Sequence, residues 1–253
     1  MNWIRHRALN RELMAGTWLN LGSSLTAEIA ARAGFDWVVI DLEHGAGDHE
    51  SLVHQLQAVS GAAAAPLVRI AWNEAPRFKR ALDLGPAGVV VPYVTSAEEA
   101  AQAISAMRYP PQGIRGVASL NRASNFGRDF DAYFAGANDG LVTVVQVETE
   151  ATLDRVDTIA AVDGVDVLFV GPMDLSVSMG IPLQYTHPRF RSALARVSDA
   201  CRAAGKAAGI LLGRPEQVKD TVEAGFTFIG LGSDGGVMAQ GMKALAEAFR
   251  GYR

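Results

Sequence analysis

Short apolar runs alternate with longer amphipathic segments along the whole chain. The short runs are rich in β-branched and aromatic residues, which predicts strands over residues 17–21, 37–42, 67–70, 88–94, 141–149, 165–170, 208–212 and 226–231. Several of these runs are apolar at nearly every position, as in WVVIDL, GVVVPYV and VDVLFV. This pattern is typical of parallel strands that are covered on both faces.

The longer segments predict helices over residues 26–33, 49–59, 75–84, 97–107, 152–161, 188–204, 215–224 and 236–249. Ser96 marks a helix start, and glycines such as Gly34 and Gly205 stand where helices should stop. Eight strands alternating with eight helices predict an α/β fold, a (β/α)8 TIM barrel spanning residues 1–253 as one domain. A doubly wound sheet is the alternative, but no G-x-G-x-x-G motif follows the first strand.

Composition excludes several classes of protein. The formal net charge is −4 and the pI is near 5.7, without a basic patch, so we expect neither nucleic acid nor a membrane surface as a partner. No apolar segment is long enough to span a bilayer and no signal-peptide pattern is present, which favours a cytoplasmic location. The single cysteine, Cys201, cannot form an internal disulfide.

Polar side chains gather where several predicted strands end. In (β/α)8 barrels the loops that follow the strands carry the chemistry. Acids, an imidazole, a guanidinium and a Gly-Pro turn stand at such positions in this chain: Asp41, His44, Arg69, Gln146, Glu148, Gly171, Pro172, Met173, Asp174 and Leu212. We therefore expect the active site at this end of the barrel.

Gln146 and Glu148 stand two residues apart on a predicted strand, so both side chains point to the same face. If that face is the barrel interior, an unpaired carboxylate there is costly. Arg69 or backbone N–H groups are one way to satisfy it, and a metal ion is the other. With a metal, Asp174 is the natural second ligand, because two carboxylates and water suit Mg²⁺ or Mn²⁺.

His44 and Arg69 each have a catalytic and a structural interpretation. An imidazole among acids at a strand end suits proton transfer near neutral pH, although a histidine there also serves as a structural hydrogen-bonding group. A guanidinium at the rim binds a carboxylate or stabilises an oxyanion, and its alternative role is an ion pair across the barrel. None of the four lysines stands at the end of a predicted strand, so a Schiff-base mechanism has no candidate residue.

The motifs WVVIDLEHG, PLVRIAW, RYPPQGIRGV and VVQVETEATLDRVDTIAAVDGVDVLFVGPMDLS together resemble the HpcH/HpaI family of class II pyruvate aldolases. The resemblance covers nearly the whole chain, in order, and the combination of D-x-E-H, Q-x-E and G-P-x-D-L-S is specific. The named member of the family cleaves 4-hydroxy-2-oxoheptanedioate. The resemblance implies a divalent-metal-dependent aldehyde-lyase that acts on a small-molecule 2-oxo acid and an aldehyde, with Mg²⁺, Mn²⁺ or Co²⁺ as cofactor.

The resemblance also implies a role for each matching residue. Glu148 and Asp174 match the metal ligands, Gln146 the glutamine beside the metal, and Arg69 the pyruvate-binding arginine. His44 matches the catalytic histidine. Asp83, in ALDLG, looks like the aspartate that orients the histidine, and Asp41 is its nearer rival in sequence. The backbone of residues 171–174 would hold the substrate carboxylate, with Met173 and Leu212 beside it.

The family typically assembles as a hexamer, a trimer of dimers, with the last helix packed on a neighbouring subunit. Met173 and Leu42 stand where the best-known member has smaller residues, which leaves open whether pyruvate or hydroxypyruvate is the donor and which aldehyde is the acceptor. We also expect the irregular stretch 108–127, with Arg115, to shape the acceptor site.

Three other functions fit parts of the pattern. An acyl-CoA carbon–carbon lyase of the citrate lyase β-subunit kind shares the barrel and metal, but no basic cluster for CoA phosphates is seen. A phosphate-binding isomerase is suggested by the glycine-rich GLGSDGG turn, for which a helix cap at Asp234 is the simpler interpretation. A non-catalytic oligomeric binding protein is the third.

Overall fold

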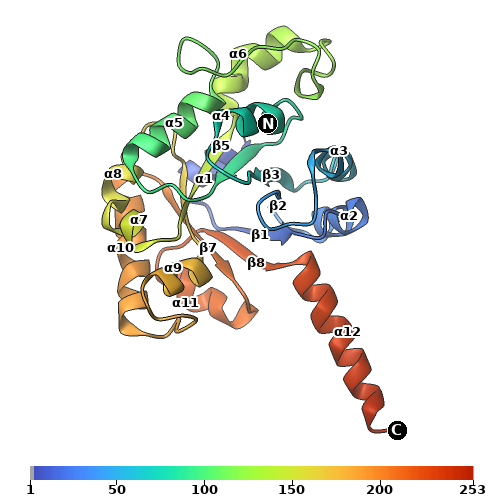
Figure 1. Ribbon diagram of the computed structural model, residues 1–253, viewed down its shortest axis with the longest axis vertical. Helices are drawn as coiled ribbons and strands as arrows, with labels where there is room; N and C mark the ends of the chain where they lie inside the picture. The colour runs from blue at the N-terminus through green and yellow to red at the C-terminus, as the bar shows by residue number, and fades with distance from the viewer. Residues whose placement is uncertain (1–2, 253) are drawn as a thin grey trace.

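Eight parallel strands close into a barrel in sequential order in the computed structural model, which describes residues 3–252 (Figure 1). The strands are β1 (Met14–Leu19), β2 (Trp37–Asp41), β3 (Ala65–Arg69), β4 (Gly88–Val91), β5 (Val142–Val147), β6 (Val167–Val170), β7 (Ala207–Leu212) and β8 (Phe228–Ser233). Every neighbouring pair is parallel, including the closing pair of β8 with β1. The predicted single (β/α)8 barrel is confirmed.

Helices connect the strands and surround the barrel: α1 (Trp3–Leu9), α2 (Ser24–Arg32), α3 (His49–Ala58), α4 (Ala75–Leu82), α5 (Ala97–Met107), α6 (Phe130–Gly140), α7 (Glu150–Asp154), α8 (Val156–Ala160), α9 (Pro172–Ser178), α10 (Pro188–Ala204), α11 (Val218–Glu223) and α12 (Asp234–Arg250). Side-chain caps begin several of them. Asp48 and Ser51 form a reciprocal capping box at α3, and Ser96 caps α5 as predicted. No helix within residues 3–252 is long and apolar enough to cross a membrane.

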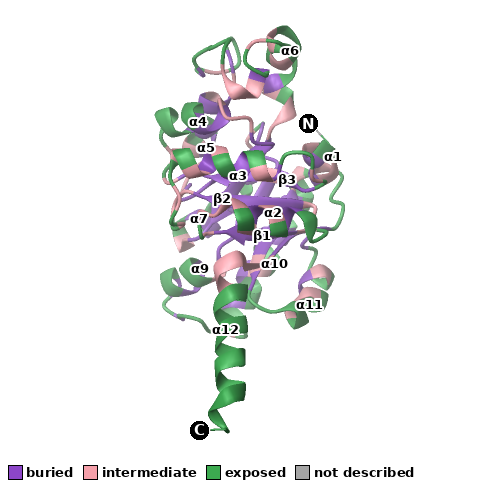
Figure 2. Cartoon of the chain, turned by 90° about the vertical axis from the view of Figure 1, so that its right-hand side faces the viewer, coloured by how far each residue is buried: buried purple, intermediate pink, exposed green. Residues whose placement is uncertain are grey.

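Aromatic rings fill the interior of the barrel. Trp37 stacks on Phe228 with ring centroids 4.4 Å apart, and Trp18 packs edge-on to Trp37. Gly16 makes room for this cluster, because a Cβ at that position would lie 2.0 Å from the Trp37 ring. A second apolar layer lies between the strands and the surrounding helices, so the strands are buried on both faces (Figure 2).

Three helices are absent from the predicted set. α1 places Ile4 and Ala8 against the inner aromatic cluster, below the point where the strands begin. α6 lies after the long stretch 108–127, and the seven-residue α9 begins directly after the Gly171 that follows β6. The helix predicted over residues 152–161 is divided at Arg155 into α7 and α8.

The long irregular stretch 108–127 lies at the end of the barrel where the strands begin. It follows α5 and leads through α6 into the start of β5, and a helix in this fold runs antiparallel to the strand before it. Arg115 is fully buried there, against Asp83 and Tyr133. Within one chain, this stretch and Arg115 therefore lie away from the strand ends where the acceptor site was expected.

α12 leaves the barrel instead of packing on it. It begins at the end of β8 and projects away from the body of the molecule (Figures 1 and 2). None of its residues is buried, although it carries a stripe of large apolar side chains: Val237, Met238, Met242, Leu245 and Phe249. The 4-3-4 spacing from Met238 to Phe249 places this stripe along one face of the helix.

Candidate active site

The ends of β2 and β3 place two charged residues side by side. Asp41 and Arg69 are the last residues of these neighbouring strands and are partners in the register of the sheet. Arg69 Nε donates to Asp41 Oδ1 at 2.9 Å, and Arg69 Nη2 donates to Oδ2 at 2.7 Å. Because both side chains are buried, this two-point ion pair fixes the plane of the guanidinium.

Glu43, which is absent from the predicted site residues, is a further partner of Arg69. Its Oε2 lies 2.7 Å from Arg69 Nη1, and the Glu43 side chain is almost fully buried. Burial raises the pKa of the Glu43 carboxyl, and the nearby Arg69 charge lowers it. The alternation of Asp41 with Glu43 in the D-x-E-H motif was the available signal, since both face the same guanidinium.

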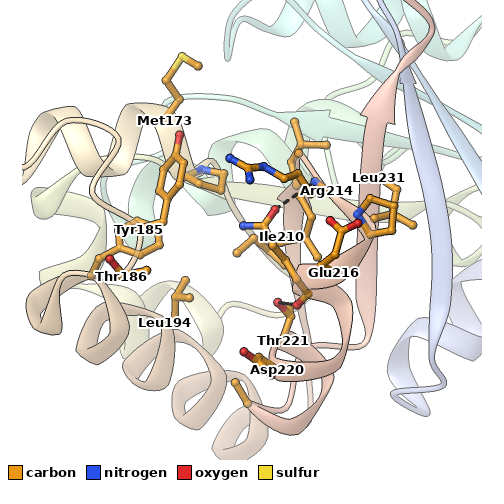
Figure 3. A pocket seen from close by; sticks show the side chains of 18 of the residues that line it. Met173, Tyr185, Thr186, Leu194, Ile210, Arg214, Glu216, Asp220, Thr221 and Leu231 are labelled. Carbon is orange, nitrogen blue, oxygen red and sulfur yellow. Dashed lines mark hydrogen bonds between the residues drawn. The ribbon is translucent and has the colours of Figure 1, made fainter. Parts of the chain in front are cut away.

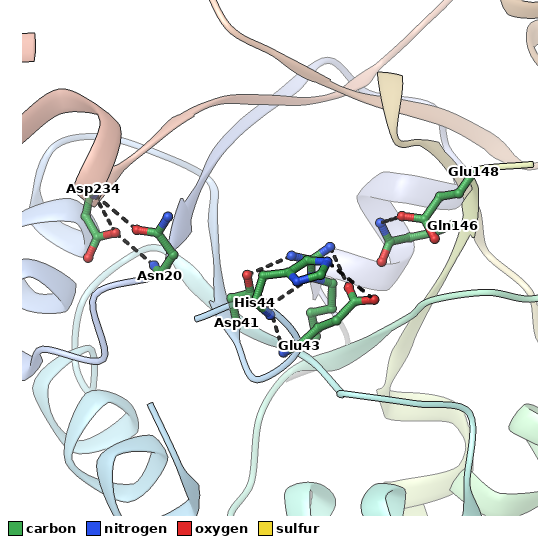
Figure 4. Close-up of polar contacts among 9 residues, drawn as sticks. Asn20, Asp41, Glu43, His44, Gln146, Glu148 and Asp234 are labelled. Carbon is green, nitrogen blue, oxygen red and sulfur yellow. Dashed lines mark hydrogen bonds and ion pairs between the residues drawn. The ribbon is translucent and has the colours of Figure 1, made fainter. Parts of the chain in front are cut away.

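A tight turn holds the residues after β2 in place (Figure 4). Asp41 Oδ1 accepts backbone N–H groups from Glu43 at 3.0 Å and from His44 at 3.3 Å. Gly45 is required next, because a Cβ there would lie 2.1 Å from the Asp41 carbonyl oxygen. The His44 side chain is 67% exposed, with Nε2 3.9 Å from Glu43 Oε1. The imidazole is therefore open to a substrate that enters this end of the barrel.

Gln146 and Glu148 form a second buried polar group at the end of β5 (Figure 4). Gln146 Nε2 donates to Glu148 Oε1, and the backbone N–H of Tyr93 donates to Glu148 Oε2 at 3.3 Å. Burial, followed by the charge of Glu43, raises the pKa of Glu148 to about 7. The predicted placement of both side chains on one face is confirmed, although Glu148 lies just beyond the strand.

Asp174 lies in the first turn of α9, and its charge also raises the pKa of Glu148. Gly171, which precedes α9, allows this approach, because a Cβ there would lie 3.0 Å from Glu148 Oε1. Met173 is largely exposed, whereas Leu212, at the end of β7, is buried. The predicted metal ligands thus come from adjacent segments and interact electrostatically.

The donor set fits a hard divalent cation. Among residues 3–252, no three His, Cys, Asp or Glu side chains form a ready-made metal site, and the two predicted ligands, Glu148 and Asp174, are both carboxylates. Beside them Gln146 Oε1 is buried and has no hydrogen-bond partner. Mg²⁺ or Mn²⁺ prefers oxygen ligands, and either ion would neutralise negative charge here. It would also give the unpaired amide oxygen a partner.

Comparison with known protein families matches residues 14–241 to the model of the HpcH/HpaI aldolase/citrate lyase family. This chain belongs to that family. The 5-keto-4-deoxy-D-glucarate aldolase of Salmonella arizonae is 41% identical over 240 residues, which are 95% of this chain and 93% of that protein. Since such relatives are named aldolases, this member of the family is an enzyme, an aldehyde-lyase.

Several solved structures are similar to this fold. An HpcH/HpaI aldolase/citrate lyase family protein from Burkholderia cenocepacia has a TM-score of 0.94 and 36% identity, covering 99% of this chain and 100% of that one. The citrate synthase SbnG has a TM-score of 0.87 and 28% identity, with 98% of each chain covered. The shared fold therefore covers nearly the whole of this chain.

The four lysines of this HpcH/HpaI-family chain lie away from the predicted catalytic residues. Lys79, Lys219 and Lys243 are on α4, α11 and α12, and Lys206 precedes β7 at the opposite end of the barrel. The predicted distribution of lysines is confirmed, and a Schiff-base mechanism has no lysine where strands end.

Asp83 and His44 lie at opposite ends of the barrel. Asp83 ends α4, immediately before β4 begins, whereas His44 follows the end of β2. Asp83 Oδ1 accepts a hydrogen bond from Arg115 Nη2 at 2.9 Å. The Asp41 carboxylate is bound by Arg69, and the hydrogen bond that His44 makes to it comes from the backbone. Within one chain, the predicted pairing of Asp83 with His44 is not formed.

The glycine-rich turn after β8 is occupied by a carboxylate. Ser233 caps α12 by accepting the N–H of Gly236, so the cap is one residue earlier than the predicted Asp234. Asp234 accepts the backbone N–H of Asn20 at 2.8 Å and the hydroxyl of Thr26 at 2.7 Å. This negative charge opposes the binding of a phosphate at the turn.

A long groove lies on the outside of the barrel, between α10 and α11 (Figure 3). Tyr185 and Leu194 line one side, and Arg214 and Thr221 line the other. The groove extends past β7 to the first turns of α12, whose departure from the barrel leaves this surface uncovered. Pro172, Met173 and Leu212 are also among its lining residues, so one end of the groove reaches the predicted carboxylate-binding residues.

Proposed function

We propose that the protein is a divalent-metal-dependent aldolase that reversibly adds the enolate of pyruvate or hydroxypyruvate to an aldehyde. The observation that carries the proposal is the buried Gln146–Glu148 pair, with its unpartnered oxygen, beside Asp174 and opposite Arg69. The 4-hydroxy-2-oxo acids, such as 4-hydroxy-2-oxoheptanedioate, are the corresponding cleavage substrates.

Glu148 and Asp174 are the proposed metal ligands, and Gln146 is the neighbour that orients Glu148. When bound, the cation supplies Lewis-acid polarisation of the ketone of the 2-oxo acid. The backbone at residues 171–174 is proposed to bind the substrate carboxylate. Burial excludes water from Glu148, which strengthens every charge interaction at this point.

Arg69 is proposed to stabilise the enolate oxygen. Asp41 and Glu43 hold the guanidinium in one orientation, so little reorganisation is needed as negative charge develops. His44 accepts a proton from the carbon next to the ketone, and the electron pair of that C–H bond forms the enolate. The enolate carbon then attacks the aldehyde carbon, and the aldehyde oxygen takes up the proton that His44 holds. Cleavage is the reverse sequence.

We further propose a homo-oligomer, a hexamer built as a trimer of dimers, in which α12 packs on a neighbouring copy. The exposed apolar stripe of α12 supports this, because an isolated helix with such a face is otherwise left in water. We propose the uncovered groove between α10 and α11 as the surface on which the α12 of a neighbouring copy packs.

Proton exchange at the methyl carbon of pyruvate tests the activity without an acceptor. In deuterium oxide with Mg²⁺, the wild-type protein should replace methyl protons by deuterium, as followed by NMR. Glu148→Gln and Asp174→Asn should lose this exchange, whereas Glu150→Gln, at an exposed ion pair with Arg189, should retain it. Exchange that persists in EDTA, or in Glu148→Gln, would refute the proposal.

A further inference from the structure

Glu43 lies between the arginine and the histidine of the site. Its Oε2 is 2.7 Å from Arg69 Nη1, and its Oε1 is 3.9 Å from His44 Nε2 (Figure 4). The side chain of Glu43 is 6% exposed, whereas that of His44 is 67% exposed. In the function proposed above Glu43 only holds Arg69, and its second contact, with the imidazole, has no role.

The turn after β2 fixes the backbone that carries Glu43 and His44. Asp41 Oδ1 accepts the N–H groups of both residues, at 3.0 and 3.3 Å. Gly45 follows in close contact with the Asp41 carbonyl, where no Cβ would fit. The ion pair with Arg69 then fixes the carboxylate of Glu43 on this backbone. A carboxylate of fixed position is therefore presented to the imidazole.

The charges around Arg69 are unbalanced. Its guanidinium is the partner of two carboxylates, Asp41 and Glu43, and both are almost fully removed from water. Two negative charges against one positive charge leave one negative charge in surplus. Asp41 binds the guanidinium at two points and Glu43 at one, so the surplus lies on the side of Glu43. A proton taken up by His44 would make the four groups neutral together.

Glu43 and His44 also interact electrostatically. Burial raises the pKa of the Glu43 carboxyl, and the positive charges of Arg69 and His44 lower it. An opposite charge within roughly 4–6 Å stabilises the charged form of a group. A substrate bound over the exposed imidazole would displace water from it, and the attraction between the two groups would become stronger.

We infer that Glu43 is a positioning residue for His44, and that its carboxylate stabilises the imidazolium that forms when His44 Nε2 takes the proton of the 2-oxo acid. The electron pair of the C–H bond becomes the enolate, and the proton stays on Nε2 beside Glu43 until the aldehyde oxygen takes it. This role is filled within one chain, whereas the role implied for Asp83 requires a second copy. It rests on the proposed aldolase function, to which it adds a further residue.

Two reactions of 2-oxo acids distinguish this role from the support of Arg69. Methyl-proton exchange of pyruvate forms the enolate by removing a proton from carbon, so it needs the base. Decarboxylation of oxaloacetate forms the same enolate by breaking a carbon–carbon bond: CO₂ leaves, the electron pair stays behind, and no proton is removed from carbon. Both reactions need a group that stabilises the enolate oxygen. Loss of help to His44 should therefore lower exchange more than decarboxylation.

Glu43→Gln is the informative variant, because its amide oxygen can still accept a hydrogen bond from Arg69 but carries no charge. With Mg²⁺, the ratio of kcat for exchange to kcat for decarboxylation should fall about ten-fold, while KM for pyruvate changes little. Glu43→Asp keeps the charge and should lose less of this ratio. His44→Ala should lose at least as much of it as Glu43→Gln. Arg69→Lys should lower both rates together.

Three controls separate the possible failures. Glu74→Gln removes a carboxylate from an exposed ion pair with Arg77 and should leave the ratio unchanged. Decarboxylation above the rate with Mg²⁺ alone shows that a variant is folded, and Glu43→Asp takes the place of Glu43→Gln if the latter does not fold. If the wild type exchanges no methyl protons, the proposed function has failed. If it exchanges them, but Glu43→Gln lowers neither rate or lowers both by the same factor, Glu43 does not act through His44.

Discussion

Arg69 and Asp41 end two neighbouring strands and bind each other through two hydrogen bonds, of 2.9 and 2.7 Å. This relationship joins fold to chemistry, because the register of β2 with β3 is what brings the two side chains together. The guanidinium is thereby oriented before any substrate arrives. An oriented cation stabilises a developing oxyanion more effectively than a mobile one.

Removal of Arg69 should therefore reduce aldol turnover strongly. Arg69→Ala is expected to lower kcat/KM by a hundred-fold or more, about 3 kcal/mol, as loss of an oxyanion donor does. It also leaves Asp41 and Glu43 buried without a partner, so folding is checked by thermal denaturation. Arg69→Lys keeps the charge but loses the two-point geometry, and an intermediate rate is expected. Full activity in folded Arg69→Ala would show that Arg69 does not stabilise the enolate oxygen.

The stability of the metal-free protein should depend on pH through Glu148. Its pKa of about 7 in the folded chain lies above the ordinary value of 4.5, so the folded state holds this proton more tightly than the unfolded state. The free energy of unfolding should then fall by about 3 kcal/mol as pH rises through that interval. The measurement is urea denaturation in EDTA at about pH 5 and about pH 8.

Glu148→Gln provides the comparison, because the amide does not titrate. This variant should lose less stability than the wild type over the same interval, and saturating Mg²⁺ should remove the loss from the wild type. Equal pH dependence in both proteins would show that the Glu148 carboxyl is not perturbed in this way.

An orienting role of Asp83 toward His44 requires a second copy of the chain, because the two residues lie at opposite ends of one barrel. His44→Ala and Asp83→Ala should each be inactive alone. Mixed, dissociated and reassembled, they should regain a measurable fraction of wild-type activity, since some sites receive both intact residues. Full activity in Asp83→Ala alone would instead show that Asp83 does not orient His44.

The apolar stripe of α12 should hold the oligomer together. Met242→Glu and Leu245→Glu place charges in the stripe and should shift the protein to smaller species in analytical ultracentrifugation. Lys243→Glu, on the opposite face of the same helix, is the matched control and should assemble normally. An unchanged sedimentation profile for the stripe variants would contradict the proposed role of α12.

The order of the strands and the main catalytic end were predictable from local pattern. Runs such as WVVIDL specify buried parallel strands, and the (β/α)8 rule then places Asp41, Arg69 and Glu148 at a common end. The spacing of Asp41 and Glu43 was a signal that both could face one partner, but the contact of Glu43 with Arg69 also depends on how the turn at Gly45 folds back. The spacing of residues in the sequence does not by itself specify how the Glu43 side chain is placed beside Arg69.

Other features depended on information that local pattern does not contain. The stretch 108–127 was expected near the acceptor, yet it lies between the end of a helix and the start of a strand, which places it at the other end of the barrel. The periodicity of residues 236–249 predicted a helix but not its departure from the barrel. Local periodicity does not specify whether the apolar face of a helix packs on its own barrel.

The central claim is that Glu148 and Asp174 together bind a divalent cation beside a 2-oxo acid. The most direct measurement is a crystal structure with Mn²⁺ and pyruvate, using anomalous diffraction to locate the metal. The account predicts an anomalous peak bonded to both carboxylates, with pyruvate bound between it and Arg69. Crystals containing ordered pyruvate but no anomalous peak between Glu148 and Asp174 would contradict it.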